Sequence, residues 1–370
     1  MIKIFHMGDV HLDSAFHRFP KEQRVKLRAH QRKLFLKMID HVRQGGYDML
    51  LISGDLFDGI DVSVECEECV ISALSSLACP VVISPGNHDP FELISTYRKQ
   101  KLSENVYVFS SYEPQVFDFP EIGVQVCGYA FLRSNELSYD PLEGFTPPEF
   151  DGVRLLCAHG ELGVSGSKFA PLYEAEIAAK GFKYAALGHV HTPSVTEKDG
   201  AVIAYCGVSE GRGFDECGIG GALSVVIDGD RVTTERVEFG EYEYKVVSFD
   251  VSGISDAAEL LKTLAGLVDA TEKKDTSALR IELSGEAEIS LEINCEDLAA
   301  ALSDRIFYLE IKDKTYPKID TSALSLDSTL RGEIYRVLGA ALESESPEER
   351  KKAAEALRIA LLAVEGREIG

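Results

Sequence analysis

Five apolar runs of this sequence each end in polar residues that can bind metal ions. Asp9 and His11 follow the run 2–7, Asp55 follows 49–53, Asn87, His88 and Asp89 follow 81–84, His159 follows 154–158, and His189 and His191 follow 184–187. Functional groups of α/β sheets gather in the crevice at the carboxyl ends of the strands. If the runs are strands of that kind, we expect these side chains to meet in one site.

The residue types favour a centre of two metal ions. With His88 set aside, they offer two carboxylates, one amide and four imidazoles, a set that suits Mn²⁺, Fe²⁺ or Zn²⁺ better than a thiolate-preferring metal. These ligands are too many for one ion, so they divide between two ions that share a carboxylate. Two ions about 3.5–4 Å apart can activate water and stabilise in-line displacement at phosphorus.

The elements that must position these residues alternate along the first 240 residues. Short runs rich in Val, Ile and Leu are separated by helical patterns, which predicts an α/β layer whose sheet is buried on both faces. The helical patterns lie at 21–43, 64–77 and 172–180. Two later runs, 223–227 and 231–239, are joined by Asp228-Gly229-Asp230, which is typical of a β-hairpin. We expect residues 1–240 to form the catalytic domain.

The pattern of predicted strands and helices changes after residue 240. Patterns between 241 and 320 predict a small β-α-β-β-α-β domain, with one of its strands at 289–293. Residues 321–370 predict a helical hairpin, whose second helix begins at Ser346 as N-cap, Pro347 at the first helical position and Glu349 three residues after the cap. This hairpin would either dock on a partner or cover the chain's own core.

The composition is that of a folded cytoplasmic protein. Of the 370 residues, 45% are hydrophobic and 27% are charged, as in ordinary globular proteins. No stretch approaches the about 20 apolar residues of a membrane helix, so we expect no membrane association. Residues 1–9 are too short and too soon charged for a signal peptide. Eight cysteines are expected to be small apolar residues, because no second pair or nearby histidine completes a zinc site with Cys66 and Cys69.

The charge is unevenly distributed. The whole chain carries a formal net charge of −23, which by itself argues against binding a phosphate backbone. Between His17 and Gly45, however, nine Lys and Arg residues oppose two acidic residues, a net charge of +7. This predicted helix begins just after the first metal motif, so it is either a phosphate-binding surface or simply a solvated face. The candidate phosphate contacts are Arg24, Arg28 and Arg32, with Arg212 as a fourth.

Together the metal motifs resemble those of the calcineurin-like metallophosphoesterases. The matching elements are Asp9-x-His11, Gly54-Asp55, Gly86-Asn87-His88-Asp89, His159 and Gly188-His189-x-His191. The resemblance covers about residues 1–240. It implies an α/β fold in which a β-sandwich flanked by helices holds two metal ions between the ends of its sheets.

The resemblance also implies a role for each residue. Asp9, His11 and His191 would bind one ion, Asn87, His159 and His189 would bind the other, and Asp55 would bridge both. His88 would protonate the leaving oxygen or stabilise the transition state, and Asp89 would orient His88 through a hydrogen bond. The nucleophile would be a metal-bound hydroxide. Mn²⁺ is the first expectation for the ions, with Fe²⁺ and Zn²⁺ as alternatives.

Other segments distinguish among members of the superfamily. Protein phosphatases follow their second motif with a phosphate-binding arginine, which residues 54–59 lack. Residues 9–16 and 54–58 instead resemble the SbcD-type DNA repair exonucleases, and their YhaO-like branch most of all. Residues 210–218 are also similar to that branch, whereas Cys-Gly-Val-Ser at 206–209 stands where Pro-Gly-Asn or Pro-Gly-Ser is expected.

The second resemblance implies a DNA exonuclease or endonuclease that acts in DNA repair. SbcD-type nucleases carry a small capping domain and then helices that dock on an SbcC-like, SMC-type ATPase, and residues 241–320 and 321–370 match that layout. A homodimer also fits the family. Two alternatives stay open, a small-molecule phosphodiesterase acting on cyclic nucleotides and a DNA-end-binding scaffold with weak hydrolysis. A closed pocket at the metals would favour a small substrate, and an open groove along the basic helix would favour DNA.

Overall fold

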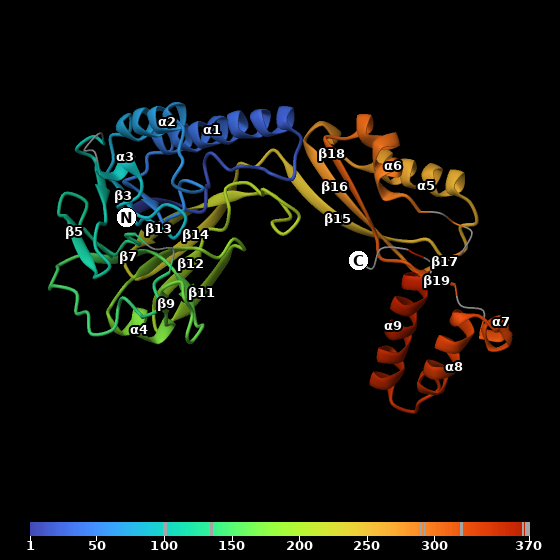
Figure 1. Cartoon of the computed structure of the whole chain (residues 1–370). Helices are drawn as coiled ribbons and strands as arrows, with labels where there is room; N and C mark the ends of the chain where they lie inside the picture. The colour runs from blue at the N-terminus through green and yellow to red at the C-terminus, as the bar shows by residue number, and fades with distance from the viewer. Residues whose placement is uncertain are drawn as a thin grey trace. The chain divides into compact units, whose positions relative to one another are not determined.

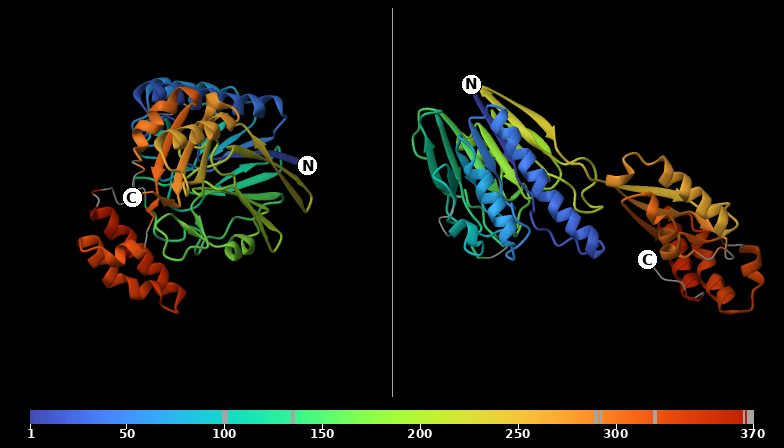
Figure 2. Two further views of the ribbon diagram at one scale, coloured as in Figure 1. Left: turned by 90° about the vertical axis from the view of Figure 1, so that its right-hand side faces the viewer. Right: turned by 90° about the horizontal axis from the view of Figure 1, so that it is seen from above.

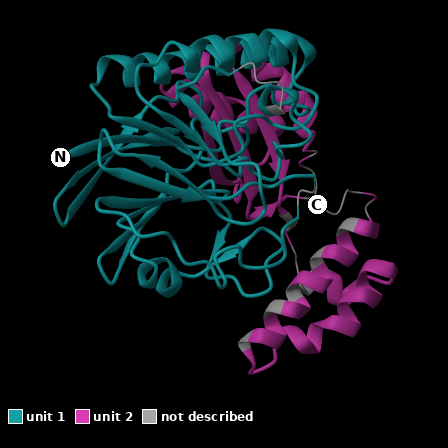
Figure 3. Ribbon diagram, turned by 90° about the vertical axis from the view of Figure 1, so that its left-hand side faces the viewer, with its two compact units in different colours: residues 1–242 teal, residues 243–370 magenta. Residues whose placement is uncertain are grey.

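The computed structural model describes residues 1–98, 102–133, 136–288, 291, 293–318, 321–364 and 366. The chain forms two compact units, residues 1–242 and residues 243–370 (Figure 3). The division between the units falls next to the expected boundary at 240. The further boundary at 320 stays a prediction.

Two six-stranded sheets form the centre of the first unit (Figure 1). In spatial order, the first sheet consists of β14 (Arg231–Glu238), β13 (Gly221–Asp228), β1 (Ile2–Met7), β2 (Met49–Ile52), β3 (Val81–Ile83) and β4 (Val106–Val108). The second consists of β11 (Ser194–Lys198), β12 (Ala201–Tyr205), β10 (Tyr184–Gly188), β7 (Val153–His159), β6 (Val124–Gly128) and β5 (Gln115–Phe119). The expected β-sandwich is therefore confirmed.

Among the described residues of this unit, four helices flank the two sheets. They are α1 (Lys21–Gln44), α2 (Val64–Ser75), α3 (Ser95–Arg98) and α4 (Glu174–Ala179). Figure 2 shows α1 and α2 side by side over the first sheet. The apolar residues of α1 recur at helical spacing, so Leu34 and Met38 are buried against that sheet while the opposite face is solvated. On the outer face of the second sheet, Ile177 of α4 packs into a separate core.

Alternate residues of each strand face opposite sides, which explains the unbroken apolar runs. In β2, Leu50 and Ile52 pack against the helices, whereas Met49 and Leu51 pack between the sheets. The predicted hairpin is present, since β13 and β14 pair with Asp228 opposite Arg231. Two short strands, β8 (Glu161–Leu162) and β9 (Pro171–Leu172), pair beside the second sheet's carboxyl edge.

The second unit contains a three-stranded parallel sheet and helices. Its elements are β15 (Glu243–Asp250), α5 (Ala257–Ala270), η1 (Lys274–Thr276), β16 (Ser277–Ser284), β17 (Glu286–Ala287), α6 (Cys295–Leu302), η2 (Ser303–Arg305), β18 (Tyr308–Asp313), β19 (Tyr316–Pro317), α7 (Thr321–Leu326), α8 (Leu330–Leu342) and α9 (Pro347–Val364). The sheet order is β15-β16-β18. Three residues of the strand expected at 289–293 lie outside the described residues.

The helices α8 and α9 form the predicted hairpin. At the start of α9, the backbone N–H of Glu349 donates to the Ser346 hydroxyl over 3.4 Å, as expected for an N-cap. Leu357 and Leu361 of α9 pack with Leu324 of α7 in a small core of their own. Across the described part of the chain, every helix is too short or too polar to span a bilayer.

Candidate metal centre

The candidate ligands lie at the ends of five central strands. Strands β1, β2 and β3 are parallel neighbours in one sheet, and β7 and β10 are parallel neighbours in the other. Met7 pairs with Ile52 and Gly188 pairs with His159, so the strands of each pair end at the same level. The loops after these strands therefore meet at one edge of the sandwich, as the sequence pattern predicts.

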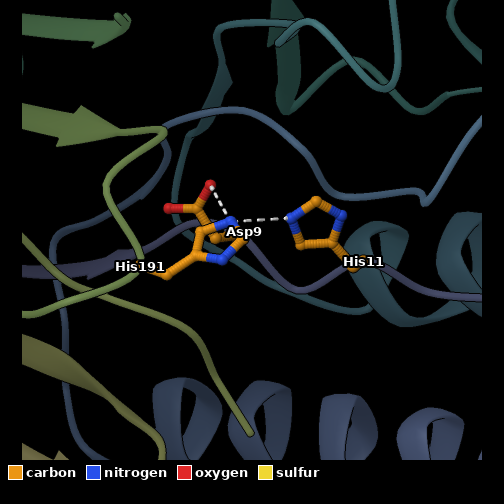
Figure 4. A group of neighbouring side chains, drawn as sticks. All are labelled: Asp9, His11 and His191. Carbon is orange, nitrogen blue, oxygen red and sulfur yellow. Dashed lines mark hydrogen bonds and ion pairs between the residues drawn. The ribbon is translucent and has the colours of Figure 1, made fainter. Parts of the chain in front are cut away.

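One group of ligands is formed by Asp9, His11 and His191, each of which offers an atom within 4.8 Å of the others (Figure 4). The Nε2 atoms of the two rings lie 3.3 Å apart, and Nε2 of His191 lies 3.9 Å from Asp9 Oδ1. Three donor atoms thus converge on one small volume, as ligands of a single ion must.

The Nδ1 atoms of the same two rings contact carboxylates. Nδ1 of His11 lies 3.0 Å from Asp58 Oδ1, and Nδ1 of His191 lies 2.7 Å from Glu216 Oε1. A ligand histidine commonly donates its second ring N–H to a carboxylate, which fixes the tautomer and the ring orientation. Asp58 and Glu216 therefore aim both Nε2 lone pairs at the shared volume.

A second group contains Asp9, Asp55 and His159, again within 4.8 Å of one another. Asn87 Oδ1 lies 2.9 Å from His159 Nε2 and 3.1 Å from His189 Nδ1, so the amide and both rings converge. The other nitrogen of His159 donates to the Ser53 carbonyl over 2.9 Å, which leaves Nε2 as the ligand atom.

Asp55, a member of the second group, also lies close to the first group. Its Oδ2 atom is 3.7 Å from His11 Nε2 and 3.4 Å from His159 Nε2. Its Oδ1 atom accepts the backbone N–H of His88 over 2.9 Å, which fixes the carboxylate plane. This is the position that a bridging ligand requires. The structure thus brings together all seven residues that the sequence proposes as ligands.

The backbone at the ligands is unusual. Asp9, His11 and Asp55 have φ angles of 48°, 49° and 50°, and His189 has φ of 100°. Left-handed backbone is uncommon for residues other than glycine and costs of order 1–3 kcal/mol at such sites. Gly54 has φ of 96°, and a Cβ atom there would lie 2.4 Å from His159 Nδ1, so this loop position requires glycine.

The electrostatics of the site suit divalent cations. Asp9 and Asp55 are each 1% exposed, and burial raises the pKa of Asp9. Burial would also raise the pKa of Asp55, but the His159 and His11 rings hold it well below its usual range. Burial, together with His159, lowers the pKa of His189 to about 3, so that ring is neutral, as a ligand must be. Two buried carboxylates, an amide and four imidazoles form a donor set that fits two such ions.

The expected partnership between Asp89 and His88 is wrong. Nδ1 of His88 lies 3.3 Å from Asp58 Oδ1, and this hydrogen bond raises the pKa of His88 despite its partial burial. Asp89 is fully buried and accepts hydrogen bonds from backbone N–H groups of the loops at 55–57 and 86. The carboxylate of Asp89 therefore fixes the ligand loops, and Asp58 contacts the His88 ring.

The candidate phosphate contacts differ in their surroundings. Nε of Arg24 donates to the Phe19 carbonyl over 2.8 Å, and Nε of Arg28 donates to the Ser14 carbonyl over 2.9 Å. Both arginines thus lie along the loop that follows the first metal motif. Arg32 is paired instead with Glu65 at 3.0 Å and Asp13 at 3.6 Å. Arg212 is likewise occupied by acidic partners.

Sequence reasoning missed Asp58 and Glu216. Both belong to segments that carry the resemblance, but a carboxylate there has no distinctive spacing from the histidine it contacts. Asp58 is 47 residues from His11, so only the fold brings them together. The sequence signal for Asp58 was its place three residues after Asp55, on the same ligand loop.

The eight cysteines are free thiols. Burial raises the pKa of Cys66 to about 12, so its thiol stays protonated at neutral pH. None of the candidate metal groups found among the described residues contains a cysteine. Four of the cysteines are buried, as small apolar residues commonly are, whereas Cys217 is exposed.

Comparison with known proteins identifies a matching family and several distant relatives. The family model of calcineurin-like phosphoesterases matches residues 2–193. The chain is 23% identical to the uncharacterized metallophosphoesterase YhaO of Bacillus subtilis over 299 residues, covering 77% of this chain and 72% of that protein. It is 25% identical to the DNA double-strand break repair protein Mre11 of Methanopyrus kandleri over 361 residues, covering 89% of this chain and 77% of that protein. It is 27% identical to a probable cyclic nucleotide phosphodiesterase of Fibrobacter succinogenes over 202 residues, covering 52% of this chain and 73% of that protein.

Proposed function

This chain belongs to the calcineurin-like phosphoesterase family, and on that basis we propose that it is a DNA exonuclease or endonuclease of DNA repair that uses two metal ions. The observation that carries the proposal is the attachment of the basic helix α1 to the ligand cluster. Gln31 of α1 donates to the His11 carbonyl over 2.9 Å, and Arg28 donates to the neighbouring Ser14 carbonyl. A phosphate backbone held by this helix would therefore pass close to the ligands.

The exposure of the site supports a large substrate. The side chains of His88 and His191 are 46% and 31% exposed, so this side of the ligand cluster is open to solvent. A small-molecule site would bury most of its ligand in a cleft. The similarity to an Mre11 protein over 89% of this chain supports the same substrate class.

The proposed chemistry assigns roles to this chain's own residues. Asp9, His11 and His191 would hold one ion, Asn87, His159 and His189 the other, with Asp55 between them; Mn²⁺ is the first expectation. Such ions supply Lewis acidity and lower the pKa of water. Asp58 holds Nδ1 of His88, which leaves the other ring nitrogen to donate a proton to the leaving oxygen.

The second unit would provide partner binding. Leu326 of α7 and Val337 of α8 are 88% and 77% exposed, and such exposed apolar side chains support docking of the C-terminal helices on an SbcC-like, SMC-type ATPase. A homodimer remains a further proposal of the same kind. Both can be tested by co-purification with a candidate ATPase and by light scattering of the chain alone.

A second candidate function is hydrolysis of cyclic nucleotides. The similarity to a probable cyclic nucleotide phosphodiesterase favours it, although that match covers 52% of this chain. A DNA-end-binding scaffold is less well supported, because a scaffold needs neither the complete ligand set nor His88.

The deciding experiment supplies both substrates to the same protein. The purified chain is incubated with Mn²⁺ and labelled single- and double-stranded DNA, and separately with cyclic nucleotides. We expect DNA cleavage that EDTA abolishes. Asp55→Asn, purified in parallel, controls for contaminating nucleases and should be inactive. Cleavage of cyclic nucleotides alone would contradict the nuclease proposal.

Binding of DNA by α1 is tested by its salt dependence. Each phosphate contact contributes about 0.9 to the slope of log K against log salt concentration on B-DNA. The double variant Arg24→Ala, Arg28→Ala should therefore reduce the slope by about 2. Arg43→Ala, at the other end of the same helix and paired with Asp40 at 2.8 Å, is the matched control and should leave the slope unchanged.

A further inference from the structure

Arg212 lies between two carboxylates beside the ligand cluster. One terminal nitrogen donates to Asp58 Oδ1 over 3.0 Å, and the other donates to Glu216 Oε1 over 2.8 Å. Nε and the backbone N–H of Arg212 both reach Glu216 Oε2, at 3.3 Å and 2.7 Å. The guanidinium therefore fixes the distance and the relative orientation of the two carboxylates.

Each of these carboxylates also contacts one ligand histidine of the first group. Asp58 contacts His11 over 3.0 Å, and Glu216 contacts His191 over 2.7 Å. A continuous chain of hydrogen bonds thus runs from one ring through Arg212 to the other ring. The far nitrogens of the two rings face each other at 3.3 Å, so any shift of Arg212 changes the separation of two ligand atoms.

We propose that Arg212 is a positioning residue that sets the geometry of the metal site formed by Asp9, His11 and His191. This inference rests on the proposed metal centre and assigns a function within it. It replaces the expectation that Arg212 holds a DNA phosphate. The side chain of Arg212 is only 19% exposed, and three of its nitrogen–hydrogen groups already serve acidic partners.

Lysine cannot take the place of Arg212. Its ammonium is a point charge without the planar fork that reaches two carboxylates in fixed directions. In a direct phosphate contact, by contrast, lysine would serve nearly as well, because ammonium groups bind phosphate readily. Arg212→Lys therefore separates the two roles while keeping the charge.

The test is a titration of the metal-free protein with Mn²⁺, in which electron paramagnetic resonance measures the free ion. Wild type should bind two ions per chain. Arg212→Lys should bind one of them about 10–100-fold more weakly, as for other changes that disturb the partners of metal ligands. Excess Mn²⁺ should then restore DNA cleavage, with little change in KM for DNA. Glu216→Gln, which breaks the same chain of hydrogen bonds at its other end, should weaken the same site.

Arg154→Lys is the matched control. Arg154 is a partly buried arginine of the same unit that donates to Gln125, Pro148 and Lys180, none of which touches the ligands. Both Mn²⁺ affinities should be unchanged in that variant. If Arg212→Lys and Glu216→Gln keep both affinities while wild type binds two ions, the inference is overturned and the metal centre stands. If wild type binds fewer than two ions, the metal centre itself is overturned, and the positioning role with it.

Discussion

Replacing Asp89 by asparagine should destabilise the first unit, because this carboxylate joins two ligand loops. It is fully buried, and its oxygens accept five hydrogen bonds. The donors are the backbone N–H groups of Asp55 (3.1 Å), Leu56 (2.8 Å), Phe57 (3.3 Å) and Gly86 (2.7 Å) and the hydroxyl of Tyr97 (2.8 Å).

The size of the effect follows from how these donors are shared. Oδ1 accepts from Asp55 and Gly86, and Oδ2 accepts from the other three donors. Asparagine keeps only one oxygen, so its NH₂ group must face at least two N–H donors whichever way the amide turns. Each buried donor left without a partner costs about 1–3 kcal/mol, so we expect a loss of about 2–6 kcal/mol in the free energy of unfolding.

Urea denaturation followed by the near-ultraviolet circular dichroism of tyrosine measures this loss. Ten of the fourteen tyrosines precede residue 243, so the signal reports mainly on the first unit. Asp118→Asn is the control, because Asp118 is exposed and accepts from Gln125, and it should change stability by less than about 0.5 kcal/mol. An equally small change for Asp89→Asn, together with lost turnover, would refute the reasoning and restore the idea that Asp89 acts on His88.

Three further predictions concern the same unit. His88→Ala should keep both Mn²⁺ ions yet lose about 10²–10⁴-fold in turnover, and loss of bound metal in that variant would make His88 a ligand. Gly54→Ala should weaken Mn²⁺ binding, because the new Cβ would lie 2.4 Å from His159 Nδ1; Gly59→Ala shares a positive φ but has nothing within 4 Å, so it should not. Burial lowers the pKa of His6 to about 3 from 6.5, so between these pH values the unfolded chain binds a proton that the folded chain does not. The free energy of unfolding therefore decreases as the pH is lowered through that range. Between pH 7 and pH 5 the cost is about 2 kcal/mol, and His6→Gln should remove that part of the pH dependence of urea unfolding; an unchanged profile would contradict the assignment.

The fold was predictable where local pattern decides the structure. The helix expected at 21–43 is α1, because its apolar residues recur at helical spacing around a buried stripe. The helix expected at 172–180 begins only at Glu174, because Pro171 and Leu172 pair with β8 instead. The assignment of the strands to two sheets could not be predicted from the local sequence pattern. An apolar run that is buried on both faces has the same pattern in either sheet.

The site was predictable to the extent that it depends on strand ends. Asp9 and Asp55 follow the parallel neighbours β1 and β2, so their meeting needs only strands in register. His159 ends β7 of the other sheet, so its approach to them also requires the two sheets to pack face to face. Side-chain pairs between distant segments were not predictable. From the sequence, Arg32 is expected to be available for a phosphate. The fold, however, brings the carboxylate of Glu65, 33 residues away, to within 3.0 Å of its guanidinium.

These ion pairs reduce the basic surface that the proposed function requires for DNA binding. Three acidic residues from outside α1, namely Asp13, Glu65 and Glu241, pair with Arg32 and Lys37 and reduce the local net charge from +7 to +4. Arg24 and Arg28 donate to neutral carbonyls instead, so their charges remain uncompensated by those contacts. Both lie in the first third of α1, beside the loop that leaves His11. Because two bound divalent ions would add four positive charges at that same end, the field that attracts phosphate should be strongest there. Under the proposed function, the overall charge of −23 would repel DNA from the other faces of the chain and leave it one approach to the metal ligands.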